Sequence, residues 1–394
     1  MLQTRYHFVG IGGVGMSAIA QVLNGEGLLV TGSDRAHDQG GNRVVFSKLA
    51  AQGINLFPQN GSGVTPHTSF VVVSTAIEED NPDIRAARRL TIPIVKRAEL
   101  LAQLFNSKYG IAIGGTSGKT TVTGMVGWAL DAAGLAPSVL NGGAILNYVS
   151  DTAIGNAKRG SSNIVCIEAD ESDGSIVHYR PKVAAVTNIT KEHKTLDELF
   201  GLFGSFAKAT SDLVVLNADD PTLARLTVEA QRVTFGITAR ADVKADDVEL
   251  LATGSRFRVG ERAYELSVPG AHNVSNALVA IAIARHLNAD EAKVADGLRT
   301  FQGIARRLAR VAEVNGVLVL DDYAHNPAEI AVAIAAARHG RRRVLAVYQP
   351  HGFGPTRFVR QELVDAFAAS LTPSDALFMP EIYYAGGTAD KSLS

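Results

Sequence analysis

The 394-residue sequence is poor in cysteine, and its two kinds of charge nearly cancel. The one cysteine, Cys166, excludes an internal disulfide and lies in the apolar run 164–167, so we expect a buried, unreactive thiol in a reducing compartment. With 38 basic and 39 acidic residues, the formal net charge is −1. The chain therefore has no overall attraction for nucleic acid or for an anionic membrane surface, and any binding of phosphate must be local.

Long hydrophobic runs are also lacking. The run 8–16 is interrupted by four glycines, and the run 279–284 is too short to cross a membrane. These absences predict a cytoplasmic protein with neither a signal peptide nor a spanning helix. The length predicts two or three domains, and we expect a monomer or a weak homodimer.

A glycine loop in the middle of the chain carries a lysine and two threonines. It covers residues 114–121, follows an apolar run and opens the amphipathic stretch 122–133, which predicts strand, loop and helix. Such a loop binds phosphate, with Lys119 reaching the terminal phosphates and a threonine hydroxyl binding Mg²⁺. The strict pattern G-x-x-x-x-G-K-[ST] is not met, because Ile113 stands five residues before Gly118. An ordinary glycine-rich turn is the alternative.

A second glycine loop lies near the N-terminus. Residues 10–15 follow the predicted strand 6–9 and lead into the helical stretch 16–23, so they match G-x-G-x-x-G in its required context. Asp34 ends the next strand, where a dinucleotide-binding fold places the carboxylate that holds ribose hydroxyls. The pattern predicts a diphosphate ligand, which NAD and a nucleotide sugar provide equally well. Alternatively, the glycines only allow a helix to pack tightly on a strand.

Polar residues follow two predicted strands of the central region. Glu168 opens the acidic run 168–173 after an apolar strand, where a P-loop fold holds its magnesium. Some of the other carboxylates in this run are expected only to solvate a loop. His193 follows the strand 183–186 in the same predicted sheet. This position makes His193 a better candidate for a ligand than a lone histidine, which is more often structural.

The last part of the chain adds an amide pair and two loops. Asn273 and Asn276 lie three residues apart at the start of a long helix, so their amides can read a nucleobase edge or cap the helix. The loops 321–327 and 349–357 follow strand ends, where α/β sheets place ligands. This third α/β unit is short, and we interpret it as a fold cut before its final strands.

Several of these motifs together resemble the Mur ligases, most closely the branch that adds L-alanine to UDP-N-acetylmuramate. The segments that are similar in order and spacing are 12–16, 76–82, 115–121, 168–173, 270–276 and 321–327. The resemblance spans the whole sequence and accounts for the compressed phosphate loop, since G-T-x-G-K-T-T is the family's own form.

The resemblance implies a three-domain α/β fold. A Rossmann-like UDP-sugar domain is expected over 1–106, a P-loop ATPase domain over 107–308, and an incomplete Rossmann-like C-terminal domain over 309–394. The implied reaction forms an amide through an acyl phosphate. The carboxylate of the sugar's lactyl group attacks ATP, ADP leaves, and an amine attacks the acyl phosphate, while Mg²⁺, Lys119 and an arginine meet the developing charge.

The resemblance also implies roles for individual residues. The expected catalytic residues are Lys119, Glu168, His193 and Arg307, and the expected Mg²⁺ ligands are Thr120, Glu168 and His193. The residues expected at ATP are Gly115, Thr116, Ser117, Gly118, Lys119, Thr120, Thr121, Asn273, Asn276, Arg306, Asp322 and His325. The residues expected at the UDP-sugar and the amino acid are Gly12, Gly13, Gly15, Met16, Ser17, Asp34, Ser74, Tyr323, His351 and Arg357. Either Arg306 or Arg307 is expected to meet the terminal phosphate.

The sequence departs from the alanine-adding branch at several positions. Ser117 and Asn326 stand where that branch usually has histidine, and residues 194–195 are Lys-Thr in place of Met-Asp. The loop 349–357 has glycines and an extra residue where the branch is basic. These departures predict that the preferred amine is not simply L-alanine.

Three alternatives to this ligase remain at this point. An NAD(P)-dependent oxidoreductase is suggested by residues 10–15 and Asp34, but it leaves the Lys119 loop unexplained. A catalytically impaired nucleotide-binding homologue is suggested by the short third domain. A ligase of the same superfamily that adds to a muropeptide or to a folate-like acceptor is the third.

Overall fold

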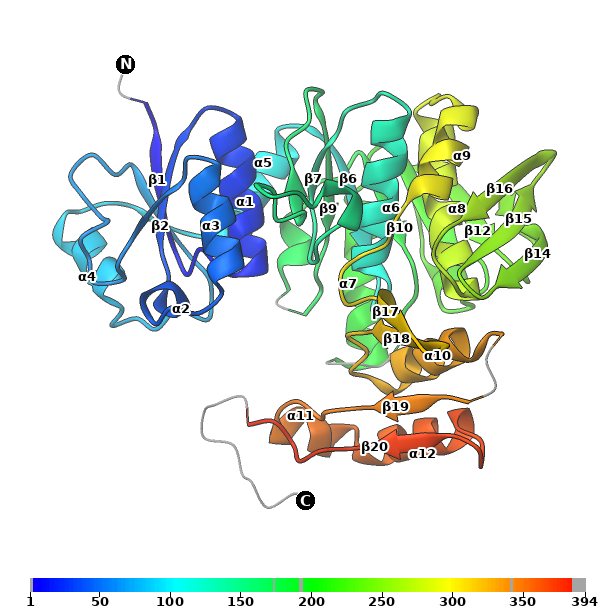
Figure 1. Ribbon diagram of the computed structural model, residues 1–394. Coiled ribbons are helices and arrows are strands. Elements are labelled where there is room, and N and C mark those ends of the chain that lie inside the picture. The colour runs from blue at the N-terminus through cyan, green and yellow to red at the C-terminus, as the bar shows by residue number, and fades with distance from the viewer. Residues whose placement is uncertain (1–2, 173, 191–193, 341–342, 385–394) are drawn as a thin grey trace. The chain divides into compact units, whose positions relative to one another are not determined.

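The computed structural model describes residues 3–172, 174–190, 194–340 and 343–384 (Figure 1). The chain forms two compact units. Unit 1 comprises Met1–Lys244 and Asn276–Ile304, and unit 2 comprises Ala245–Ser275 and Ala305–Ser394. Helices and strands alternate through most of unit 1, so the predicted α/β class is confirmed.

The first sheet of unit 1 is parallel, with the strand order β3-β2-β1-β4-β5 (Figure 1). Its strands are β1 (Arg5–Val9), β2 (Leu29–Ser33), β3 (Asn55–Phe57), β4 (Phe70–Val73) and β5 (Ile94–Lys96). Its helices are α1 (Val14–Gly25), α2 (Arg35–Asp38), α3 (Arg43–Ala51), α4 (Pro82–Arg89) and α5 (Arg97–Asn106). The strand order reverses at β1, so the N-terminal glycine loop lies where doubly wound sheets bind ligands.

The second sheet of unit 1 has the order β13-β12-β11-β10-β6-β9-β7-β8. Its strands are β6 (Tyr109–Gly114), β7 (Ser138–Leu140), β8 (Ala157–Lys158), β9 (Ile164–Glu168), β10 (Val183–Val186), β11 (Leu213–Asn217), β12 (Gln231–Gly236) and β13 (Val243–Lys244). β8 pairs antiparallel with β7, and the other neighbours pair in parallel. Ile111, Ala112 and Ile113 of β6 are fully buried, as expected for an apolar run in a parallel sheet covered on both faces. The strand order again reverses at β6, which precedes the phosphate loop.

Helices flank this central sheet (Figure 1). They are α6 (Lys119–Ala132), α7 (Leu196–Lys208), α8 (Ala271–His286) and α9 (Glu291–Thr300), with the short 3-10 turns η1 (Leu146–Tyr148), η2 (Ser175–His178) and η3 (Leu223–Arg225). The helix predicted after the phosphate loop is confirmed, with Lys119, Thr120 and Thr121 in its first turn. α6 begins at Lys119, because Gly118 adopts a φ of 86° and ends the loop there. Thr195, one of the departures noted above, forms a capping box with Glu198 at the start of α7.

Unit 2 begins with an antiparallel sheet of β14 (Asp246–Leu251), β15 (Gly254–Val259) and β16 (Arg262–Leu266). It continues with β17 (Ala309–Val314), β18 (Val317–Asp321), α10 (Pro327–Arg338), β19 (Leu345–Val347), α11 (Phe353–Phe358), α12 (Arg360–Ser370) and β20 (Ala376–Phe378). β17 and β18 form a hairpin whose turn, Asn315-Gly316, has the two positive φ angles that a type I′ turn requires. β19 and β20 pair in parallel, and a small core forms around Ile334 and Phe367.

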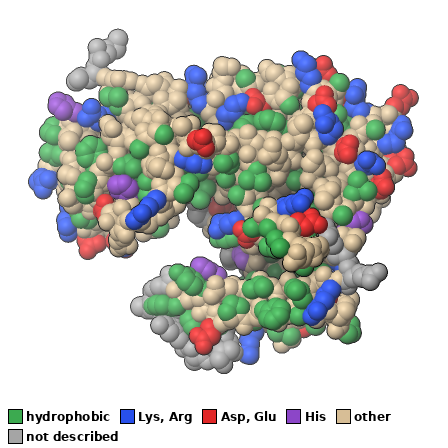
Figure 2. All heavy atoms as spheres, in the orientation of Figure 1, with side chains coloured by type: hydrophobic (Ala, Val, Ile, Leu, Met, Phe, Trp, Pro, Cys, Tyr) green, Lys and Arg blue, Asp and Glu red, His purple; other side chains and the backbone are tan. Residues whose placement is uncertain are grey.

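Charged side chains of both signs are interspersed on the face that Figure 2 shows, which agrees with the near-zero net charge. Among the described residues, no helix combines the length and the apolar character needed to cross a membrane.

Candidate active site

The phosphate loop connects β6 to α6 through two glycines with positive φ. Gly115 has a φ of 131°, and a Cβ atom there would lie 2.0 Å from the hydroxyl oxygen of Thr187, at the end of the neighbouring strand. Gly118 has a φ of 86°. Other residues are therefore disfavoured at both positions, and at Gly115 the loop backbone packs directly against Thr187. Thr121 lies half-buried in the first turn of α6.

Lys119 forms a nearly buried ion pair with a carboxylate of the acidic run. Its Nζ atom lies 2.8 Å from Oε2 of Glu171, and the two side chains are 12% and 4% exposed. The ammonium also donates to the carbonyls of Gly115 at 2.7 Å and Thr116 at 3.3 Å. Burial alone would lower the pKa of Lys119, but the carboxylates of Glu171, Asp170 and Glu168 together outweigh it, and the pKa is raised. Glu171 is therefore not one of the carboxylates of this run that only solvate a loop.

Glu168 and Thr120 lie together beside the phosphate loop. The Thr120 hydroxyl donates to both carboxylate oxygens of Glu168, at 2.9 and 3.1 Å, and the N–H of Gly142 donates to Oε2 at 2.9 Å. Burial raises the pKa of Glu168 against the opposing effect of Lys119. A carboxylate and a hydroxyl are oxygen donors of the kind that Mg²⁺ prefers, so these residues fit a magnesium ion.

The third predicted ligand, His193, lies outside the described residues. Within the described part of the chain, no group of three or more His, Cys, Asp or Glu side chains could hold a metal ion.

Asn188 was not predicted, yet it holds the phosphate loop in place. Its Oδ1 atom accepts from the N–H of Ser117 at 2.9 Å and from the hydroxyl of Thr116 at 2.6 Å. Its Nδ2 group donates to the carbonyl of Ser117 at 3.0 Å. The only sequence signal was its place directly after β10, next to the strand that precedes the loop. The Ser117 hydroxyl oxygen is buried, and among the described residues it has no hydrogen-bond partner.

The two predicted adenine ligands belong to different units. Asn276 lies in unit 1 beside the phosphate loop, where its Oδ1 atom would be 3.3 Å from a Cβ atom on Gly118. Asn273 lies in unit 2, and its Nδ2 group donates to the carbonyl of Pro269 at 2.7 Å. Of the two amides, that of Asn273 is therefore bonded to the backbone just before α8.

The N-terminal glycine loop is held by a carboxylate. The N–H of Gly12 donates to Oδ2 of Asp34 at 2.8 Å, and the other oxygen accepts from Ala36 and caps α2. The carbonyl of Ser33 accepts from the N–H of Gly10 at 2.8 Å. Asp34 thus orients the loop itself, and contact with a ribose stays a prediction.

The other predicted residues near this loop differ in exposure. Gly13 is exposed, while Gly15 and Ser74 are half-buried. Met16 and Ser17 are buried inside α1, at 3% and 1% exposure. Of the glycines in this loop, Gly13 is the exposed one, and contacts of Met16 and Ser17 with substrate stay predictions.

In unit 2, predicted residues from two separate segments come together around Glu329. The guanidinium of Arg306 lies 4.6 Å from the centre of the Tyr323 ring, and that of Arg307 lies 5.4 Å from it. Arg307 also lies 3.7 Å from Oε1 of Glu329, whose Oε2 is 3.1 Å from Nδ1 of His325. This cluster presents two guanidinium groups held over an aromatic ring, which suits recognition of phosphate.

Asp322 supports the same cluster through the backbone. It accepts hydrogen bonds from the N–H groups of Leu308 and Ala324, both at 2.7 Å, and burial raises its pKa. Two further predicted residues of unit 2 follow β19. His351 stacks on Tyr383 with ring centres 4.8 Å apart, and Arg357 is exposed on α11.

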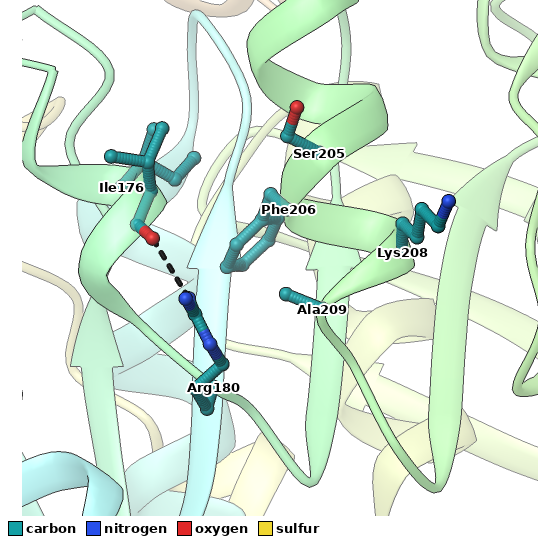
Figure 3. Close-up of a pocket in the computed structure, with 7 residues that line it drawn as sticks. Ile176, Arg180, Ser205, Phe206, Lys208 and Ala209 are labelled. Carbon is teal, nitrogen blue, oxygen red and sulfur yellow. Dashed lines mark hydrogen bonds between the residues drawn. The ribbon is translucent and has the colours of Figure 1, made fainter.

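Unit 1 also has a hollow of about 320 Å³ between η2 and α7 (Figure 3). Its lining includes Arg180, which donates to the carbonyl of Val177 at 2.8 Å. Arg180 and Ala209 precede β10 and β11, whereas the phosphate loop follows β6. Because these strands are parallel, the hollow lies at the opposite edge of the sheet from the phosphate loop.

Comparisons with known proteins agree with this geometry along the chain. Residues 5–109 match the model of the Mur ligase family catalytic domain, residues 113–284 the Mur ligase middle domain, and residues 306–381 the Mur ligase glutamate ligase domain. The chain is 39% identical to the UDP-N-acetylmuramate–L-alanine ligase of Paracoccus denitrificans, over 96% of this chain and 82% of the relative. It is 38% identical to the enzyme of the same name from Geobacter sulfurreducens, over 99% and 85%.

A solved structure gives the same result. The model is similar to the UDP-N-acetylmuramate-alanine ligase MurC of Thermotoga maritima, with a TM-score of 0.79 and 28% identity over 96% of this chain and 91% of that one. A murein peptide ligase of Psychrobacter arcticus shares the fold, with a TM-score of 0.70 and 23% identity. On these findings, the chain belongs to the Mur ligase family.

Proposed function

We propose that this chain joins L-alanine to UDP-N-acetylmuramate with hydrolysis of ATP to ADP and phosphate, as a step in peptidoglycan precursor synthesis. The observation that carries the proposal is the identity of 38–39%, over nearly the whole chain, to ligases of that name. The names of these relatives favour L-alanine as the amine. The departures in the sequence predict instead that another amine is preferred. The proposed location is the cytoplasm, and the buried thiol of Cys166 supports a reducing compartment.

The proposed reaction has two steps. First, a carboxylate oxygen of the sugar's lactyl group attacks the γ-phosphorus of ATP, the bond to the β-phosphate oxygen breaks, and ADP leaves. Second, the amine nitrogen attacks the acyl carbon, phosphate leaves, and the nitrogen gives up a proton. Most of the rate acceleration in such a transfer comes from positioning the anions together and neutralising their charge.

The residues of unit 1 support these steps. Lys119 offers a buried ammonium to the phosphates, and the first turn of α6, whose N–H groups have no acceptor within the helix, offers backbone donors. Thr120 and Glu168 would hold Mg²⁺, which neutralises the charge that develops on the transferred phosphoryl group. The glycine loop after β1 would bind the diphosphate of the UDP-sugar, with Asp34 fixing its backbone.

The residues of unit 2 offer complementary charge. Arg306 and Arg307 carry the two guanidinium groups, and the ion pair of His325 with Glu329 orders the segment beside them. We keep the domain limits at 106 and 308 and the monomer or weak homodimer as predictions.

The test is release of ADP by the full chain. With ATP, Mg²⁺, UDP-N-acetylmuramate and L-alanine all present, we expect ADP at one equivalent per UDP-N-acetylmuramoyl-L-alanine, identified by mass spectrometry. Omission of any component should reduce the rate to background. Absence of the amide product, or oxidation of NADH in a parallel assay, would contradict the proposal.

A further inference from the structure

Asn156 is a buried amide whose side chain bonds only to α1 in the described contacts. It is 2% exposed. Its Nδ2 group donates to the carbonyl of Val14 at 2.8 Å and to the hydroxyl of Ser17 at 3.0 Å. Its Oδ1 atom accepts from Nε2 of Gln21 at 3.0 Å. The amide therefore holds the first two turns of the helix that begins at the N-terminal glycine loop.

The backbone of the same residue holds the loop beside Glu168. The carbonyl of Asn156 accepts from the N–H of Asn141 at 2.9 Å, which extends the β7–β8 ladder by one pair. The next residue, Gly142, donates its N–H to the Glu168 carboxylate. A Cβ atom on Gly142 would lie 2.3 Å from Oε2 of Glu168, so this peptide sits directly against the carboxylate.

A short path of hydrogen bonds thus joins the two proposed binding sites. It runs from the carbonyl of Val14 through Asn156 to the N–H of Asn141, and from the N–H of the next residue, Gly142, through Glu168 to the hydroxyl of Thr120. The hydrogen bonds of Asn156 with Gln21 and Ser17 are buried, so they tolerate little misalignment, because an unsatisfied polar group is costly there. A shift of the first turn of α1 must therefore be followed at Gly142 or strain the amide.

We propose that Asn156 is a positioning residue that couples the UDP-sugar site to the ATP and Mg²⁺ site, so that each ligand tightens the binding of the other. The inference rests on the proposed function. A coupling between two sites is reciprocal, so it can be measured from either ligand. An asparagine is needed because α1 presents two acceptors and one donor to it, a set that an amide matches and a carboxylate does not.

The experiment measures this coupling in the full chain. The Kd of UDP-N-acetylmuramate is determined by calorimetry, first alone and then with saturating Mg²⁺ and a non-hydrolysable ATP analogue. We expect the analogue to tighten binding by at least about fivefold in the native chain, the low end for coupled sites. In Asn156→Ala the two Kd values should agree within about twofold.

The matched control is Asn147→Ala. Asn147 also makes side-chain hydrogen bonds, at 2.8 Å to the carbonyl of Thr300 and from the N–H of Gln302, but none of these reaches α1. Its removal should leave the coupling at the native value. If Asn156→Ala does not fold, Gln21→Met removes one of the same bonds and should weaken the coupling by at least about twofold.

The outcomes separate the inference from the proposed function. Failure of the native chain to bind UDP-N-acetylmuramate or the ATP analogue would contradict the proposed function. If both ligands bind but show no coupling, or if the coupling survives unchanged in Asn156→Ala or, where that variant is unfolded, in Gln21→Met, only the role of Asn156 is overturned.

Discussion

The ammonium of Lys119 lies 2.8 Å from a carboxylate oxygen of Glu171, and both side chains are nearly buried. Lys119 also donates to the loop carbonyls of Gly115 and Thr116. A triphosphate that binds this loop must therefore compete with Glu171 for the ammonium. The pairing with Glu171 raises the pKa of Lys119 and holds its ammonium against the loop.

The first prediction concerns Lys119→Ala. Loss of a charge-assisted hydrogen bond costs about 1.5–3 kcal/mol, so we expect the Kd of ATP to rise about 10- to 150-fold in calorimetry. The variant should also unfold more easily, because Glu171 is left buried and unpaired. The double variant Lys119→Met with Glu171→Gln removes both charges, and it should regain stability without regaining ATP affinity. An unchanged Kd in Lys119→Ala would show that the loop assignment is wrong.

The second prediction concerns Asn188→Asp. This change keeps the acceptor for the N–H of Ser117, but it replaces the donor to the Ser117 carbonyl and adds a negative charge next to the phosphate loop. We expect the KM for ATP to rise by about tenfold or more while the KM for UDP-N-acetylmuramate changes by less than about twofold.

The matched control for this change is Asn217→Asp on the neighbouring strand β11. The amide of Asn217 donates to the carbonyl of Thr187 at 3.0 Å and does not bond to Ser117 or Thr116 in the described contacts. The KM for ATP should change less in Asn217→Asp than in Asn188→Asp. An equal rise of both KM values in Asn188→Asp would contradict a role of Asn188 that is confined to the phosphate loop.

The residues at the strand ends near the phosphate loop could be predicted from the sequence. Several of the side chains that hydrogen-bond or pair with the loop could not. Glu168 was expected at the end of a buried strand near the phosphate loop, and it lies beside Thr120 because parallel strands bring their carboxyl ends to one edge. The pairing of Glu171 with Lys119 was missed, because spacing within an acidic run does not say which carboxylate turns inward. Asn188 was missed because its partners lie about seventy residues earlier in the chain.

The predicted elements were more reliable than their boundaries. The strand, loop and helix around residues 109–133 were expected, and the conformation of Gly118 sets the first residue of α6 at Lys119, ahead of the amphipathic stretch that begins at residue 122. α9 was not expected, since its exposed face is polar and its apolar face, around Val294 and Leu298, is narrow. Local patterns identify an element, whereas long-range packing decides where it begins.

The third prediction concerns Gly142→Ala. The added methyl group would lie 2.3 Å from Oε2 of Glu168, so the carboxylate must move. We expect the Mg²⁺ concentration for half-maximal ADP release to rise by about tenfold, the usual effect of disturbing a metal ligand's support. Gly201→Ala is the control, because Gly201 lies inside α7 with open space around its Cα, and it should leave the Mg²⁺ dependence unchanged. A native Mg²⁺ dependence in Gly142→Ala would argue against Glu168 as a ligand.

The fourth prediction concerns pH and His272. Burial lowers the pKa of His272 from 6.5 to about 4. Between these values the unfolded chain binds a proton that the folded chain does not, so stability is present above pH 6.5 and is lost as the pH falls toward 4. When the pH has fallen below both pKa values, this change in the pKa of His272 lowers the free energy of unfolding by about 3 kcal/mol.

The measurement is urea unfolding at pH 7 and at pH 4.5, for the native chain and for His272→Leu. The free energy of unfolding should fall less in the variant than in the native chain. A proton resonance of the imidazole that titrates near pH 6.5 in the folded protein would contradict the prediction.

The last prediction concerns the amine. The α-carboxylate of L-alanine needs a cation, and in the loop after β19 the charged side chain is Arg357, which is exposed at the end of the short helix α11. We expect Arg357→Ala to raise the KM for L-alanine by about 30-fold, the low end for losing one partner of a charge pair, with the KM for ATP unchanged. Arg360→Ala, at the start of α12, is the control and should leave both values near native. Across a panel of amino acids and short peptides, L-alanine should give the highest kcat/KM. A peptide or another amino acid at the top of that panel would instead support the shifted preference that the glycines of this loop predict.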